Sequence, residues 1–255
     1  MPVVADPDRA EAQLLLDVDA TVLARFEPRR REHGGFADRF TVVGPHDRTL
    51  AAVLDELHGW RVSGDVAFGE RLVAAGGRPR RHVHVLSRDL VRDPAPVAWA
   101  DGPAPAGYRL TPVDRPASDL APACRAAYPP GHPDHADIPT PDRPEVELEQ
   151  IMSGRLMGGP LLGCSGLAVA DADDAVAGAV LINHTPAEGP WVTQIYRHPD
   201  ARGVGGPMLR RALGIATRDG LTAIGLAVTH ANPARALYAR LGFAHVAEAL
   251  NVDVP

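Results

Sequence analysis

The stretch that decides the fold lies near the C-terminus. It reads W-V-T-Q-I-Y at 191–196, H-P-D-A-R-G-V-G-G-P at 198–207, and then an amphipathic pattern from Met208 onward. The first part is typical of a strand and the last of a helix. A glycine-rich turn that leads into a helix presents unpaired backbone N–H groups and the positive end of the helix dipole. The stretch therefore predicts a binding site for an anion, and for phosphate in particular.

The residues downstream predict a second strand and a second helix. The helix that starts at Met208 is expected to end at Gly220, and the alternation over 224–228 predicts a short buried strand. A further helix is predicted to open at Asn232-Pro233, because Asn suits the N-cap and Pro the first helical position. It is expected to close at Gly242-Phe243, which places Tyr238 about two turns in.

Two motifs in this region resemble those of the GNAT acetyltransferase superfamily. The run R-G-V-G-G-P at 202–207 resembles the family's pyrophosphate motif (Q/R)xxGx(G/A), and N-P-A-R-A-L-Y-A-R-L-G-F at 232–243 resembles its second signature. The likeness is sharpest over 191–243 and extends weakly back to about Tyr108. It departs at Pro207, where Gly or Ala is usual, and this removes one N–H donor.

The glycines allow two other interpretations. A single GxGG would be interpreted as an ordinary strand-to-helix turn. The second motif is independent of the first, however, so the two together favour a cofactor site. A dinucleotide-binding Rossmann unit needs an acidic residue at the end of the next strand to hold a ribose hydroxyl. That strand ends Val228-Thr229-His230, without an acid.

The resemblance implies an α/β fold with a mixed, mostly antiparallel sheet flanked by helices. It also implies acetyl-CoA as co-substrate. The residues expected to contact this cofactor lie on the strand end, the glycine-rich turn and the second motif: Ile195, Tyr196, Arg197, Arg202, Gly203, Val204, Gly205, Gly206, Pro207, Asn232 and Tyr238.

Acyl transfer to an amine needs a proton acceptor, oxyanion stabilisation and a proton for the leaving thiolate. By resemblance, Tyr238 donates that proton; otherwise it is a core tyrosine on a helix face. The oxyanion is expected to meet a backbone N–H where 194–197 splays from its neighbour. Many relatives carry a carboxylate on this strand, whereas here Gln194 could only orient a water or the substrate. His132 and His135 are candidate bases, although loop histidines are more often simply solvated.

No metal is expected. His132 and His135 lie in one loop, and the alternation of His82 and His84 puts both imidazoles on one strand face. Neither pair has a third ligand at a diagnostic spacing. Cys124 and Cys164 are too few and too far apart for a disulfide framework, and are interpreted as reduced core residues.

Composition indicates a folded globular protein of 255 residues with 45% apolar residues. The net charge of −6 argues against non-specific nucleic-acid binding. The N-terminus lacks a basic region, and Asp17 and Asp19 interrupt the apolar run at 14–23, so neither a signal peptide nor a membrane span is expected. We expect a cytoplasmic protein with no membrane partner.

The predicted domains are an N-terminal α/β region at 1–92, an extended Pro/Ala-rich linker at 93–106 and a GNAT domain at 107–255. In the first region we expect a helix at 12–26, a strand at 40–43, helices at 50–60 and 68–75, and a strand at 80–86. The segment 67–85 resembles the helix, glycine and strand that close the second motif. The first region is therefore either a degenerate GNAT-like half, or a lid or dimerisation module; a homodimer is left open.

In the second region a strand is expected at 108–110, helices at 117–128 and 145–152, and a hairpin with strands at 167–170 and 176–183. Between the two helices, 129–144 holds six prolines and predicts a long loop. In the GNAT fold this region covers the acceptor. The acids around it would favour a cationic acceptor: Asp134, Asp137, Asp142, Glu145 and Glu147.

The sequence thus predicts an N-acetyltransferase that acts on an amine of a small molecule or peptide. The alternative is a non-catalytic acyl-CoA-binding sensor or scaffold. The missing strand carboxylate and the degenerate-looking first half are the reasons for keeping this alternative.

Overall fold

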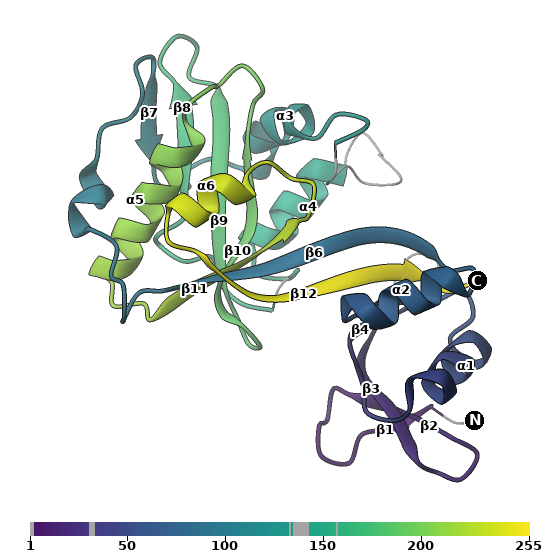
Figure 1. Ribbon diagram of the computed structural model, residues 1–255. Coiled ribbons are helices and arrows are strands. Elements are labelled where there is room, and N and C mark those ends of the chain that lie inside the picture. Colours follow the sequence, from purple (N-terminus) through teal and green to yellow (C-terminus); the bar gives the residue numbers. More distant parts are fainter. Residues whose placement is uncertain (1–2, 31–33, 133, 135–142, 157) are drawn as a thin grey trace. The chain divides into compact units, whose positions relative to one another are not determined.

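A computed structural model describes the chain except for residues 1–2, 31–33, 133, 135–142 and 157 (Figure 1). The chain divides into two compact units. The first consists of Met1–His84 with Ala247–Pro255, and the second of Val85–Val246. Each has its own core and is described by itself.

The first unit is a sheet covered by two helices. Its elements are β1 (Val3–Ala5), β2 (Gln13–Leu16), β3 (Val22–Arg30), β4 (Gly35–Val42), α1 (His46–Glu56), β5 (Arg61–Gly64), α2 (Val66–Ala74), and parts of β6 (Arg78–Asp89) and β12 (Ala244–Asp253). Strands β1 to β4 pair antiparallel, β5 is parallel to β4, and β12 is antiparallel to β5. Aromatic rings fill the core, with Phe40 stacked on Phe68 at a centroid distance of 5.4 Å.

The second unit is a mixed sheet with helices on both faces. Its elements are the rest of β6, the 3₁₀ helix η1 (Val97–Asp101), β7 (Tyr108–Thr111), α3 (Ala117–Ala127), α4 (Arg143–Met152), β8 (Gly166–Ala170), β9 (Val176–Thr185), β10 (Gly189–Arg197), α5 (Gly205–Arg218), β11 (Ala223–Thr229) and α6 (Arg235–Arg240). The strand order is β6-β11-β10-β9-β8-β7. Pairing is antiparallel from β7 to β10, and β11 is parallel to β10.

Two apolar clusters lie on the two faces of this sheet. One contains the buried face of α5 together with Tyr238, and the other contains the buried faces of α3 and α4. Strand β9 lies between them, and nine of its ten residues are buried. A strand covered on both faces is apolar along its whole length rather than alternating. The predicted mixed, mostly antiparallel sheet flanked by helices is confirmed.

The two units repeat one order of elements. In the first, the antiparallel pair β3–β4 is followed by α1, the parallel strand β5, α2 and β6. Later in the chain, β9–β10 is followed in the same order by α5, the parallel strand β11, α6 and then β12, most of which belongs to the first unit. The parallel pairs differ at their ends. Pairing of β4 with β5 continues to Phe40 and Gly64, the last residue of β5.

Two predictions for the N-terminal half and the linker differ from the structure. The expected helix at 12–26 is instead the antiparallel hairpin of β2 and β3, because Asp17 and Asp19 lie in a turn in which the N–H of Asp17 donates to the carbonyl of Thr21. The segment 93–106 is not an extended linker. It contains η1, and Ala95 and Ala100 are buried in the core of the second unit.

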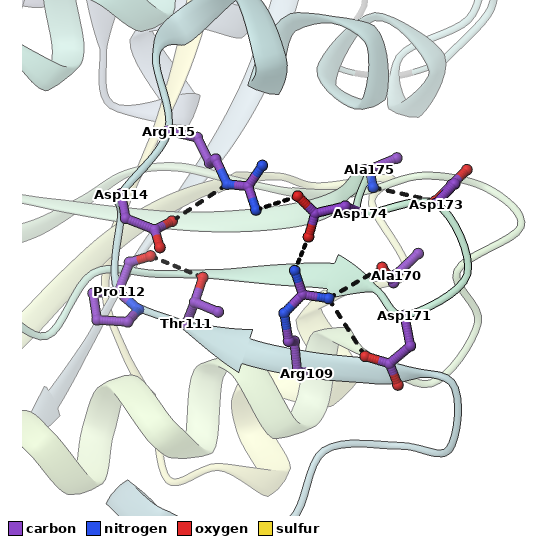
Figure 2. A network of polar contacts seen from close by, with 10 residues as sticks. All are labelled: Arg109, Thr111, Pro112, Asp114, Arg115, Ala170, Asp171, Asp173, Asp174 and Ala175. Atoms are coloured by element: carbon purple, nitrogen blue, oxygen red, sulfur yellow. Dashed lines mark hydrogen bonds and ion pairs between the residues drawn. The ribbon is translucent and has the colours of Figure 1, made fainter.

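A network of ion pairs at the edge of the second unit connects β7 to the β8–β9 hairpin (Figure 2). The Asp174 carboxylate accepts hydrogen bonds from Arg109 and, at 2.7 Å, from Arg115. Arg109 also donates to the carbonyl of Ala170. Hydrogen bonds from Arg115 and then from Arg109 hold the pKa of Asp174 below its usual value.

Asp174→Asn should cause a small loss of stability that depends on pH. Asn tolerates the positive φ of 62° at this turn, so the change removes mainly the charge. A lowered folded-state pKa stabilises above the unfolded value of about 3.9, and this contribution disappears as the pH falls through the folded value. Thermal melts of the two proteins should therefore differ slightly at pH 7 and coincide at about pH 2. A difference that persists in acid would contradict this explanation.

Candidate active site

The glycine-rich turn between β10 and α5 is held by two buried side chains. Ala201 is 2% exposed and Val204 is fully buried, so both anchor the turn to the core. Gly203 between them has φ of +87°, a conformation that favours glycine. The first helical hydrogen bond of α5 runs from the N–H of Met208 to the carbonyl of Val204, over 3.0 Å. The turn is thus fixed to the core by these two side chains, while its glycines face outward.

Four consecutive N–H groups at this turn have no acceptor among the described residues: those of Gly203, Val204, Gly205 and Gly206. The next residue, Pro207, has no N–H. Helix α5 has 14 residues, and no side chain caps its N-terminus. Unpaired N–H groups at the positive end of a helix dipole form an anion site.

A cavity of about 390 Å³ adjoins the turn. Its lining consists of Arg197, Gly203, Gly205, Gly206, Pro207, Arg210, Leu237 and Arg240. Within the described part of the chain, Arg202, Arg210 and Arg240 pair with no acidic group. Arg197 is held by its own strand end, because its Nη1 donates to the carbonyls of His198 and Pro199 at 3.0 and 2.8 Å. The cavity therefore joins free backbone donors to uncompensated positive charge.

Beside the cavity, the parallel strands β10 and β11 separate. Their pairing ends at Val192 and Leu226, although β10 continues to Arg197 and β11 to Thr229. Thr193 is a bulge in the pairing of β10 with β9. We call this separation of the strand ends the splay of β10 and β11. It lies where the sequence predicted that 194–197 separates from the neighbouring strand.

The splay exposes backbone donors of known direction. The N–H of His198 donates to the carbonyl of Ala177 in β9. The pairing of β10 with β9 has no register shift between Ile195 and this residue, so the alternation of N–H directions is unbroken there. Since successive residues of an antiparallel pair point to opposite sides, Ile195 and Arg197 direct their N–H and C=O groups away from β9 and into the splay. The carbonyl of Ile195 accepts a hydrogen bond of 2.8 Å from the Tyr128 hydroxyl.

The second motif places Asn232 and Tyr238 on the β11 side of the splay. The Asn232 side chain accepts from the N–H of Ala234 at 2.9 Å and so caps the turn that leads into α6. Asn232 is not the N-cap that the sequence predicted, because α6 begins at Arg235, its N-cap is Ala234 and no side chain caps it. Tyr238 is 4% exposed and packs on Phe243. Burial, and then the nearby negative charge of Asp134, raises the pKa of Tyr238 to about 12, so its hydroxyl is protonated at neutral pH.

The structure does not bring Gln194 to the face that holds Tyr238. The Gln194 side chain points toward α3 and contacts the Cys124 sulfur at 3.5 Å, whereas Ile195 packs in the cluster that contains Tyr238. Burial raises the pKa of Cys124 to about 11, which identifies it as a protonated core thiol.

The predicted base His135 lies outside the described residues, and so do Asp137 and Asp142. His132 is described: its Nδ1 accepts from the N–H of Asp134 at 3.0 Å. The sequence indicated Asp134 only as one of five acids around the loop and did not predict its contacts. Its carboxylate accepts hydrogen bonds from Thr229 at the end of β11 and, at 2.8 Å, from the Asn232 side chain. No spacing in the sequence connects 134 with 229 and 232, so the contact appears only in the fold.

Comparison with known proteins agrees with this geometry. The chain matches the sequence model of the Acetyltransferase (GNAT) family over residues 133–243, the segment that contains the turn, the splay and both motifs. This segment is a GNAT domain. The predicted resemblance is therefore confirmed, and the run at 202–207 that resembles the family's pyrophosphate motif contains the four N–H groups that have no acceptor among the described residues.

Solved structures share the fold over nearly the whole chain. A GCN5-related N-acetyltransferase from Sphaerobacter thermophilus has a TM-score of 0.62 at 20% identity, covering 95% of this chain and 79% of that one. A tandem GNAT protein from the clavulanic acid biosynthesis pathway has a TM-score of 0.61 at 18% identity, covering 94% and 81%. A GCN5-related N-acetyltransferase from Kribbella flavida has 0.55 at 15%, covering 91% and 87%.

No curated protein sequence matches the chain significantly. Within the described residues, none of the helices combines the length and the apolar character needed to cross a membrane.

Pro207→Ala should bind coenzyme A as tightly as the natural protein, or up to roughly tenfold more tightly. The substitution restores an N–H at the third helical position, where it has no partner within the helix, and one charge-assisted hydrogen bond can contribute that much. Isothermal titration calorimetry with coenzyme A measures the change. A marked loss of affinity in a folded variant would show that ring packing, rather than the number of donors, decides binding here.

Proposed function

We propose that the protein is an acyl-CoA-dependent N-acyltransferase that transfers acetyl from acetyl-CoA to an amine of a small molecule or peptide. The observation that carries this proposal is the row of four unpaired N–H groups at Gly203–Gly206, next to an arginine-lined cavity. A pyrophosphate supplies the acceptor oxygens and negative charge that such a site requires. Arg202, Arg210 and Arg240 would add charge at the rim.

The splay of β10 and β11 would hold the thioester arm of the cofactor. The N–H groups of Ile195 and Arg197 point into it, and either could donate to the oxyanion that forms when an amine attacks the thioester carbonyl. A carbon–nitrogen bond then forms, the carbon–sulfur bond breaks to release the thiolate of coenzyme A, and the nitrogen loses its proton to water.

Tyr238 would supply the donor for the departing sulfur. Its raised pKa of about 12 keeps the hydroxyl protonated. A thiol has an unperturbed pKa of about 8.5, so complete proton transfer from this phenol to the thiolate is uphill. A strong hydrogen bond to the developing thiolate is the contribution we infer for Tyr238.

For the first unit we propose a degenerate repeat of the GNAT half that does not bind cofactor. Its order of elements is that of β9 to β12, but β4 and β5 stay paired to Gly64, and Phe40 and Phe68 fill the space beside them. Helix α1 starts after Pro45 with Asp47 in its first turn, where a negative side chain would repel phosphate. Only the second unit would therefore carry the site.

A thiol-release assay tests the proposal. The full chain is incubated with acetyl-CoA and a panel of primary amines, and coenzyme A release is followed with a thiol reagent. Release that depends on an amine supports the transferase. Tight binding of acetyl-CoA without release for any amine would favour the alternative, a sensor or scaffold that binds acyl-CoA.

A further inference from the structure

Two histidines of β6 and a glutamate of β12 lie together within the first unit. His82 and His84 alternate along β6, and their rings stack at a centroid distance of 5.0 Å. Both rings approach one carboxylate oxygen, because Oε2 of Glu248 lies 3.2 Å from Nε2 of His82 and 3.5 Å from Nδ1 of His84. A ring nitrogen of His82 and one of His84 also lie within 4.8 Å of each other. Three possible metal ligands therefore share one place.

The third of these ligands is the one that the sequence did not supply. No metal was expected at His82 and His84, because neither has a third ligand at a diagnostic spacing along the chain. Glu248 is 166 residues from His82, and it reaches the pair because β12 lies beside β6 in the sheet. The fold thus completes a set that the sequence shows only in part.

The spacing of the three side chains suits a tetrahedral metal ion. Ligand atoms about 2.0–2.2 Å from Zn²⁺ in a tetrahedron are about 3.3–3.6 Å apart, which is close to the two separations from the Glu248 oxygen. The His84 side chain is 6% exposed, whereas those of His82 and Glu248 are 28% and 41% exposed. An ion can therefore enter from solvent, and a water can take the fourth position.

We propose that His82, His84 and Glu248 bind a divalent transition-metal ion, and that Zn²⁺ is the ion their chemistry fits. Imidazole nitrogens suit Zn²⁺, whereas Mg²⁺ and Ca²⁺ prefer oxygen ligands. Two imidazoles and one carboxylate, with water in the fourth position, are an established ligand set for zinc. The ion replaces the contacts of the two rings with the carboxylate and joins β6 to β12 in the first unit. This site is independent of the acyl transfer proposed for the second unit.

Calorimetric titration with ZnCl₂ tests the proposal on the full chain, prepared without a histidine tag and stripped of metal with a chelator. We expect saturable binding of one Zn²⁺ at this site and no such binding of Mg²⁺. Glu248→Gln and His82→Gln should each weaken Zn²⁺ binding by roughly tenfold or more, because even the loss of a group that supports a ligand costs about tenfold. Both side chains are partly exposed, so both variants should fold, and a thermal melt checks this.

His58→Gln is the matched control, because it removes an exposed histidine of the same unit that contacts the carbonyl of Pro255. It should leave the Zn²⁺ affinity unchanged. With Co²⁺ in place of Zn²⁺, the natural protein should show the strong visible absorption of a four-coordinate ion, and Glu248→Gln should lose it. Absence of saturable Zn²⁺ binding, or equal affinities in the natural protein and both site variants, would overturn the proposal. So would an equal loss in His58→Gln, which would indicate scattered binding to surface histidines.

Discussion

Gly205→Val is expected to weaken coenzyme A binding by roughly 10- to 100-fold and to leave the fold intact. A side chain at the first residue of α5 would stand between the backbone donors and the pyrophosphate, and the loss of one or two charge-assisted hydrogen bonds gives this range. The free protein has room for the change, since a Cβ at Gly205 would meet only Leu237, at 4.0 Å. Calorimetry measures the affinity, and a thermal melt checks the fold.

Gly163→Val is the control for this prediction. A Cβ at Gly163 meets nothing within 4 Å, and the residue does not line the cavity. This variant should bind coenzyme A normally. Gly203 is unsuitable for the purpose, because its φ of +87° would strain any other residue and confound folding with binding. Unchanged affinity in Gly205→Val would show that the pyrophosphate does not lie on this turn.

Tyr238→Phe should reduce kcat by roughly 100-fold, the lower end of the usual contribution of general acid catalysis. We expect a reduction in kcat near the lower end of that range for two reasons. A thiolate is already a tolerable leaving group, and the raised pKa of Tyr238 limits proton transfer. The phenylalanine ring retains the packing on Phe243, so acetyl-CoA binding should stay near normal. Stopped-flow measurement of thiol release at saturating substrates isolates the chemical step.

The outcome for Tyr238 distinguishes two roles of a buried tyrosine. A fall in kcat with unchanged Kd indicates that the hydroxyl acts on the leaving sulfur. Full kcat in Tyr238→Phe, with chemistry shown to limit the rate, would make Tyr238 a core residue and assign the proton to solvent or to the loop.

The sequence predicted the second unit well because its signals are local. The strand at 191–196, the glycine-rich turn and the helix after it correspond to β10, its turn and α5, and the Gly220 stop agrees with its positive φ of 76°. The splay was expected from the family resemblance, and the end of β10–β11 pairing at Val192 and Leu226 agrees with it.

The N-terminal half was harder to predict because its signals conflict. Leu14, Leu15 and Leu23 recur at a spacing that also fits a helix, and the deciding feature is the turn around Asp17 and Asp19. The Pro/Ala-rich run at 93–106 has the composition of a linker. Ala95 and Ala100 are buried all the same, because small side chains let η1 approach α5 closely, and a Cβ at Gly214 would lie 2.4 Å from the Ala100 nitrogen.

The position of Asp134 could not be predicted, because it depends on tertiary contacts. It is one of five acids near the loop, and nothing local distinguishes it from the others. Only the return of the chain through β11 and the second motif brings Thr229 and Asn232 to it. The same holds for Tyr128, whose partner on β10 lies 67 residues away.

We infer that this chain binds acyl-CoA at one site, on the turn at 203–206 of the second unit. Calorimetric titration of the full chain with acetyl-CoA tests it most directly. We expect saturable binding of one acetyl-CoA per chain, carried by the second unit because the first lacks both a splay and a glycine-rich turn among its described residues. Absence of binding, or a stoichiometry of two per chain, would contradict it.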